Sequence, residues 1–180
     1  NLEREKQRVV VKVGTSTLTR ENGSLKLHTI DQLARVLCDL KGMGHEVILV
    51  SSGAIGIGTG KLGMSKRPTE LRFKQAVAAV GQCEMMHLYD KFFGEYGQTV
   101  GQILLTKDVF KHSIKRNNAI NTFKALKNRS IIPIVNENDC IATDEIQEEC
   151  FGDNDILSAM TADIVDADLL IILSDVDGLY

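Results

Sequence analysis

The chain has 180 residues, of which 43% are hydrophobic, and its 21 lysines and arginines against 24 aspartates and glutamates give a formal net charge of −3. A chain of this length can bury one sizeable core. Its charges are balanced and form no dense basic run, so they do not indicate nucleic-acid binding. No apolar run approaches the roughly 20 residues needed to span a membrane. Four cysteines without a C-x-x-C pair and four scattered histidines argue against a zinc site or a disulfide framework, and they favour a reducing, cytoplasmic location.

Strand and helix patterns alternate along the chain. Residues 9–13 predict a buried strand, since four of the five are valine. Thr29 and Gln32 match a capping box and predict the start of a helix that Gly42 ends. The same patterns predict further strands at 46–50, 99–105, 131–135 and 168–173, and helices at about 70–96, 117–127 and 154–164, the first of these helices being either broken or closely packed at Gly81.

Strands this apolar, separated by helices, predict an α/β fold in which a mostly parallel sheet is sandwiched between helices. Ligands bind such sheets beyond the carboxyl ends of the strands. Polar clusters follow four of the predicted strands: Lys12-Val13-Gly14-Thr15-Ser16, Ser51-Ser52-Gly53, Asn136-Glu137-Asn138-Asp139 and Ser174-Asp175. We therefore expect these clusters to meet at one edge of the sheet.

Lys12 is unusual because it lies near the end of a buried strand. A charged side chain there needs either a compensating anion or a path along which it extends to water. A phosphate would suit this position, because Gly14 allows close approach of the backbone while Thr15 and Ser16 add hydroxyl donors. The residues alone leave both explanations open.

The glycines at 53, 56 and 58 are spaced G-x-x-G-x-G, which differs from the dinucleotide-binding pattern G-x-G-x-x-G, and the chain contains no G-x-x-x-x-G-K-[ST] loop. A glycine-rich turn can still hold an anion through its backbone N–H groups. Tight turns and close helix packing explain Gly56 and Gly58 equally well.

Residues 136–139 (Asn-Glu-Asn-Asp) and 152–155 (Gly-Asp-Asn-Asp) are dense in short acids and amides. Turns and helix caps often have this composition, and Asp153 is suited to cap the helix that follows. Caps explain one acid in each cluster. The remaining carboxylates and amides can bind an ammonium group, a metal ion or a lysine.

Taken together and in order, these motifs resemble those of the glutamate 5-kinases, within the amino acid kinase superfamily. A Lys-x-Gly motif alone also occurs in other kinases of the superfamily, but the continuation Thr-Ser with both acid-amide clusters is much narrower. The resemblance rests on Val11-Lys12-Val13-Gly14-Thr15-Ser16, Ser51-Ser52-Gly53-Ala54, Val135-Asn136-Glu137-Asn138-Asp139, Gly152-Asp153-Asn154-Asp155, Leu173-Ser174-Asp175 and Gly178-Leu179-Tyr180. It implies an amino acid kinase-like αβα sandwich in which residues 1–180 form the N-terminal, substrate-binding portion. The family pattern continues past Tyr180 with a nucleotide-binding segment that carries a second catalytic lysine.

The resemblance implies ATP-dependent phosphorylation of the γ-carboxylate of L-glutamate, the first step toward proline, with Mg²⁺, feedback inhibition by proline and a homo-oligomeric assembly. Lys12 would stabilise the transferring phosphoryl group and Asp155 would orient that lysine. Glutamate would be bound by Ser52, Asp139 and Asn154, and the phosphates and nucleotide by Lys12, Gly14, Gly53, Ser174 and Asp175. Two alternatives remain: another carboxylate or carbamate kinase of the superfamily, and a non-catalytic glutamate- or proline-binding regulatory module.

Overall fold

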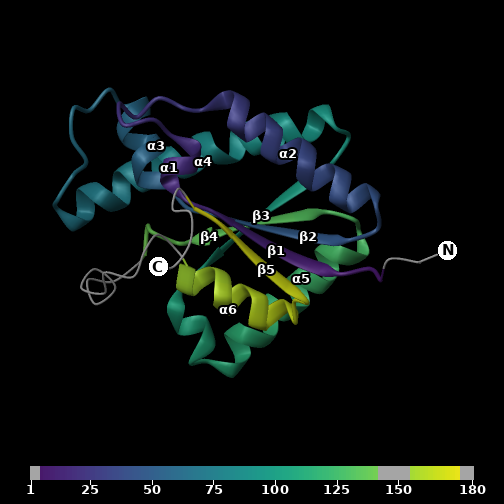
Figure 1. Ribbon diagram of the computed structural model, residues 1–180. Helices are drawn as coiled ribbons and strands as arrows, with labels where there is room; N and C mark the ends of the chain where they lie inside the picture. Colours follow the sequence, from purple (N-terminus) through teal and green to yellow (C-terminus); the bar gives the residue numbers. More distant parts are fainter. Residues whose placement is uncertain (1–4, 142–154, 175–180) are drawn as a thin grey trace, which may run out of the picture.

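The computed structural model describes residues 5–141 and 155–174 (Figure 1). Within these residues, five strands form one sheet in the order β3-β4-β2-β1-β5, and every pairing between them is parallel. The strands are β1 (Arg8–Val13), β2 (Glu46–Ser51), β3 (Val100–Leu105), β4 (Ile132–Glu137) and β5 (Leu169–Leu173). The predicted α/β sandwich is confirmed, and the described sheet is parallel throughout.

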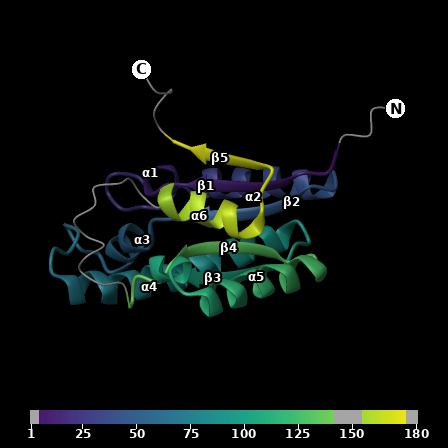
Figure 2. The ribbon, with the colours of Figure 1, turned by 90° about the horizontal axis from the view of Figure 1, so that it is seen from below.

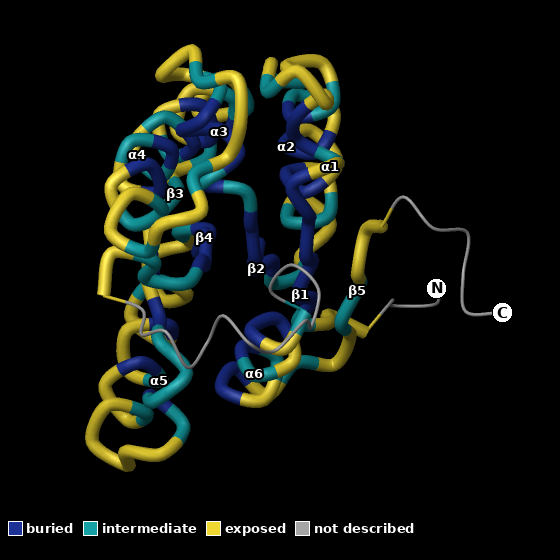
Figure 3. Tube along the Cα trace, turned by 90° about the vertical axis from the view of Figure 1, so that its left-hand side faces the viewer, coloured by how far each residue is buried: buried dark blue, intermediate teal, exposed yellow. Residues whose placement is uncertain are grey.

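Helices cover both faces of this sheet, as Figures 1 and 3 show. One face carries α1 (Thr15–Leu18), α2 (Leu27–Gly42), α3 (Ala54–Lys61) and α4 (Leu71–Glu95). The other carries α5 (Ser113–Asn128) and α6 (Asp155–Val165), and a short 3₁₀ helix, η1 (Lys107–Phe110), joins β3 to α5. No helix in the described residues combines the length and the apolar character needed to cross a bilayer.

The core consists of two clusters, one on each face of the sheet. Side chains alternate between the faces of a strand, so Val9, Val11 and Val13 pack with α2 and α4, whereas Val10 packs with α5 and α6. The same alternation places Lys12 on the face of the sheet that α6 covers. The lysine therefore enters the site from beneath the strand end, on the side opposite α3 and α4.

Two predicted helix starts were wrong. Helix α2 begins at Leu27, with Lys26 as its cap and no side-chain capping bond, so Thr29 lies inside the first turn. The backbone fixes this start instead, because the N–H of Lys26 donates to the carbonyl of Leu18 at 2.8 Å. Helix α5 begins at Ser113 rather than 117, and an ion pair of 2.9 Å between Arg116 and Asp163 ties its first turn to α6.

Helix α4 continues through Gly81, so that glycine marks close packing and the helix is unbroken. A Cβ at Gly81 would lie 1.7 Å from the backbone oxygen of Ala54, and a Cβ at Gly58 would lie 2.0 Å from that of Val77. The backbones of α3 and α4 are therefore in direct contact. Helix α3 was not predicted, because its three glycines are more typical of a turn than of a helix.

Strand β5 forms one edge of the described sheet (Figure 2). Its side chains Leu169, Ile172 and Leu173 are 43%, 45% and 37% exposed. Since neighbouring positions on a strand face opposite ways, both faces of β5 present apolar surface to solvent.

Candidate functional site

The carboxyl ends of β4, β2, β1 and β5 lie side by side, because these four strands are parallel neighbours in the sheet. Each end carries a polar group that the sequence singled out. Asp139 follows β4, Ser52 follows β2, Lys12 is the penultimate residue of β1, and Ser174 follows β5 and is exposed. The expected convergence of polar clusters at one sheet edge is therefore observed for these four residues.

Lys12 is only 4% exposed, and its Nζ lies 2.8 Å from Oδ1 of Asp155. Asp155 is the first residue of α6, where the helix dipole favours a negative charge. The lysine thus does not extend to water; its compensating anion comes from the protein. The Asp155 side chain is 48% exposed, so the pair lies at the boundary between core and solvent and its cation is held in one position beside the strand ends.

Ser52 joins the ends of β2 and β1. Both its backbone N–H and its hydroxyl donate to the carbonyl oxygen of Val13, at 3.1 and 3.2 Å. The neighbouring Ser51 shares a hydrogen bond of 2.7 Å with the hydroxyl of Tyr89 on α4, and burial raises the pKa of Tyr89 far above its usual value. Because the Ser52 proton is already engaged, its oxygen is left to accept hydrogen bonds from a ligand.

Gly53 turns the chain from β2 into α3. Its φ of +106° is strained for any residue with a side chain, and a Cβ there would lie 3.3 Å from Oγ1 of Thr15. Gly14, which is buried, stands in the corresponding place between β1 and α1. The positive φ of Gly53 is that of a tight turn. Of the two explanations considered for Gly58, close helix packing is the one observed.

The end of β4 carries two partly buried carboxylates. Burial and the nearby charge of Glu137 raise the pKa of Asp139 to about 6, and burial also raises the pKa of Glu137, with Lys107 acting in the opposite direction. Two acids in such surroundings gain from a cation placed beside them. An ammonium group of a ligand would therefore be bound favourably at Asp139.

A pair of amides that was not among the predicted site residues supports this strand end. Asn136 is buried; its Nδ2 donates to Oε1 of Gln82 on α4 at 2.8 Å, and its Oδ1 accepts from the N–H of Glu137 at 2.8 Å. The sequence could have pointed to Asn136, because a polar residue in an apolar strand must find hydrogen-bond partners when it is buried.

The chain matches the model of the amino acid kinase family over residues 7–180. The chain belongs to the amino acid kinase family. It is 60% identical over 178 residues to a protein named glutamate 5-kinase from Clostridium perfringens, covering 98% of this chain and 66% of that protein. Proteins of the same name from Listeria monocytogenes serotype 4b and Clostridium tetani are 59% and 56% identical, with 63% of each covered. The resemblance to the glutamate 5-kinases is thereby confirmed, and the chain spans slightly less than two thirds of the length of these relatives.

A solved structure, that of UMP kinase from Ureaplasma parvum, has the same fold. It superposes with a TM-score of 0.65 at 15% sequence identity, covering 98% of this chain and 73% of the kinase chain. The amino acid kinase fold of this chain thus rests on both sequence and structure.

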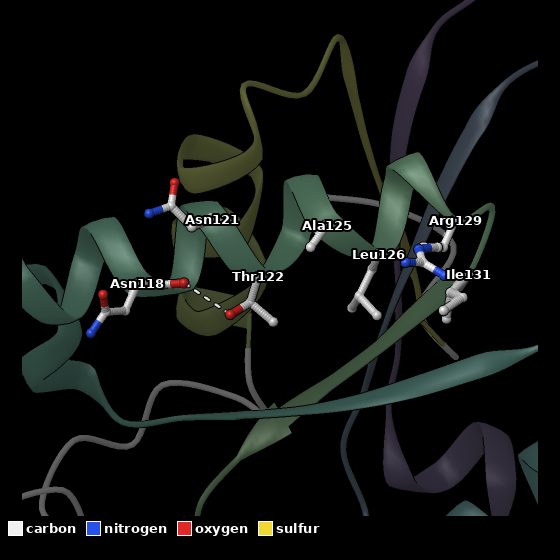
Figure 4. Close-up of a pocket in the computed structure, with 7 residues that line it drawn as sticks. All are labelled: Asn118, Asn121, Thr122, Ala125, Leu126, Arg129 and Ile131. Atoms are coloured by element: carbon white, nitrogen blue, oxygen red, sulfur yellow. Dashed lines mark hydrogen bonds between the residues drawn. The ribbon is translucent and has the colours of Figure 1, made fainter.

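The structure does not describe two of the predicted site residues, Asn154 and Asp175, or the predicted helix cap Asp153. An open hollow of about 670 Å³ lies away from the strand ends described above, along α5 and beside the amino-terminal end of β4 (Figure 4). It is lined by Asn118, Asn121, Thr122, Ala125, Leu126, Arg129 and Ile131. None of the predicted site residues lines it.

Proposed function

We propose that this chain provides the acceptor-binding portion of a glutamate 5-kinase, which transfers a phosphoryl group from ATP to the γ-carboxylate of L-glutamate. The observation that carries the proposal is the placement, at one sheet edge, of a buried cation at Lys12 and a partly buried carboxylate at Asp139. The identity of 56–60% to three proteins named glutamate 5-kinase supports it.

The reaction needs no general base. A glutamate γ-carboxyl with a pKa of about 4.3 is already ionised at neutral pH, so its oxygen attacks the γ-phosphorus directly while the bond from that phosphorus to the ADP oxygen breaks. Catalysis then depends on positioning and on neutralising the transferring group. Lys12 would supply the neutralising charge, and Asp155, 2.8 Å from its Nζ, would hold it in place.

The amino acid end of the substrate would lie over β4 and β2. Asp139 would bind the ammonium group, and the Ser52 oxygen, whose proton is donated to Val13, would accept a second hydrogen bond from the same group. Asn154 is proposed as a further glutamate ligand. Proline has an ammonium-type nitrogen but no γ-carboxylate, so it would compete for Asp139 and act as an inhibitor.

The nucleotide phosphates would be bound near Gly14, Gly53, Ser174 and Asp175. Mg²⁺ commonly binds to one or two carboxylates together with substrate phosphates. In residues 5–141 and 155–174 there is no group of three or more acidic, histidine or cysteine side chains that fits a metal ion. We propose no particular residue as a ligand of Mg²⁺. A homo-oligomeric assembly is part of the proposal on the strength of the resemblance.

The test is acceptor selectivity of the complete natural protein. We expect ATP-dependent formation of an acyl phosphate, trapped as the hydroxamate, with L-glutamate and not with N-acetyl-L-glutamate or L-aspartate. Equal turnover of N-acetyl-L-glutamate would contradict a role for the free ammonium and indicate another carboxylate kinase. Calorimetric binding of glutamate and proline without any turnover would indicate a regulatory module instead.

A further inference from the structure

Arg67 lies in the segment that joins α3 to α4, yet its guanidinium is close to the first turns of α1 and α3, the helices that follow β1 and β2. A Cβ added to Gly56 would lie 3.1 Å from Nη2 of Arg67 and 2.9 Å from Cγ2 of Thr15. Because Gly56 has no side chain, the side chains of Thr15 and Arg67 can both lie next to its backbone. Thr15 also lies within 3.3 Å of a Cβ position at Gly53, the residue that follows Ser52. These distances place the arginine beside Thr15 and near the glycine turn that follows Ser52.

The guanidinium of Arg67 has no hydrogen bond or ion pair with any residue in the part of the chain that the structure describes. Arg72, in the first turn of α4, differs in this respect, because its Nε pairs with Oε1 of Glu70. Arginine presents five N–H donors in a planar fork that matches a carboxylate. Within the described residues, those of Arg67 remain available to a ligand.

The inference rests on the proposed function. L-Glutamate carries two carboxylates and one ammonium group, and the residues assigned above provide a cation for the transferring phosphoryl group at Lys12 and an anion for the ammonium at Asp139. The α-carboxylate has no cationic partner in that set. A carboxylate in a partly buried site gains most from a charged, bidentate donor.

We propose that Arg67 binds the α-carboxylate of the amino acid substrate. It is thus a substrate-binding residue that selects α-amino acids over acceptors without this group. Gly56 contributes by leaving room for the guanidinium, which explains a glycine in the first half of α3 that contact with α4 does not explain.

The experiment compares Arg67→Leu with the matched control Arg72→Leu in the complete natural protein. Calorimetric dissociation constants are measured for L-glutamate and for 4-aminobutyrate, which keeps the amine and the distal carboxylate but lacks the α-carboxylate. We expect Arg67→Leu to weaken L-glutamate binding about 10- to 100-fold, as for loss of a hydrogen bond to a charged group, and to leave 4-aminobutyrate binding unchanged. Arg67→Lys should restore part of the loss, and Arg72→Leu should change neither constant.

Unchanged L-glutamate binding in Arg67→Leu would overturn the assignment, and so would an equal loss for both ligands, since that pattern indicates a structural role. Failure of the proposed function is seen separately, in the unmodified protein. If the wild type binds no L-glutamate, the substrate is wrong and the role of Arg67 falls with it.

Discussion

Lys12 keeps its charge inside the protein because Asp155 accompanies it. Removing one member of a buried pair usually leaves an uncompensated charge and destabilises the fold. Here the exposure of the two side chains is unequal, since that of Lys12 is 6% exposed and that of Asp155 is 48% exposed. The Oδ1 atom that faces the lysine is buried, but the rest of the half-exposed Asp155 side chain stays in contact with water. We therefore expect the fold to survive removal of the lysine.

Lys12→Ala is accordingly expected to reduce kcat of the complete natural protein about 100- to 1,000-fold, the usual effect of deleting one electrostatic donor at a transition state. The midpoint of thermal unfolding should change little. Lys115→Ala is the matched control, because Lys115 is an exposed lysine that pairs with Asp108 on the segment after β3. A kcat near that of the wild type in Lys12→Ala would exclude Lys12 from the reaction.

Asp139 gives the proposed binding step a pH dependence. Its pKa is raised to about 6, mainly by burial and secondly by Glu137. The side chain is therefore ionised at pH 7, and its negative charge is lost as the pH falls through 6. The KM for glutamate should rise about tenfold between pH 7 and pH 5, in proportion to the lost ionised fraction, while the KM for ATP stays level. Glu137→Gln should move the rise to lower pH. A glutamate KM that does not change with pH would show that Asp139 does not bind the ammonium.

Among individual residues, the sequence indicated which side chains need a partner but did not indicate which residues contact them. Lys12 stood out because a lysine in an apolar strand needs an explanation, but its partner lies on a different element, and spacing along the chain gives no distance to it. Arg67 had no signal at all. It lies in a segment between two helices that shows no helix or strand periodicity. Only the three-dimensional structure shows that its guanidinium lies beside Gly56.

At the scale of elements, the contact between α3 and α4 depends on two glycines. Gly81→Ala is expected to destabilise the fold by about 3 kcal/mol or more, because the new Cβ would overlap the backbone of α3 rather than a movable side chain. Gly94→Ala is the control in the same helix. Nothing lies within 4 Å of its Cβ position, so this change should be neutral or stabilise by up to about 1 kcal/mol. Chemical denaturation measures both, and equal stabilities would contradict the close approach.

The same glycines explain why α3 was missed. Glycine has a low helix propensity, so a segment with glycines at 56, 58 and 60 is predicted to be a turn, although the neighbouring α4 requires a residue without a side chain at Gly58. The strands were predictable for the opposite reason. Burial on both faces makes β1, β2 and the first part of β4 apolar runs that are visible without any tertiary information.

For the whole molecule, the alternation of strands and helices was sufficient to predict a parallel sheet and the edge at which its polar clusters meet. The strand order was not predictable, because the sequence does not state which strands are neighbours. That order places β5 at one edge of the described sheet, where it pairs only with β1. The apolar sequence of β5 predicts a buried strand. In the structure its leucines and isoleucine are partly exposed, because no helix of the described part covers them.

An edge strand with unpaired backbone groups and exposed apolar side chains favours self-association. We therefore expect residues 1–180 on their own to associate as concentration rises, as measured by sedimentation velocity. The double change Leu169→Thr and Ile172→Thr should reduce the association, since it makes both faces of β5 more polar and places β-branched side chains, which suit a strand, at both positions. Ile114→Thr is the control, because Ile114 is 75% exposed but lies on α5, and it should leave the association unchanged. A chain that stays monomeric at every concentration, or that responds equally to Ile114→Thr, would contradict a role for β5.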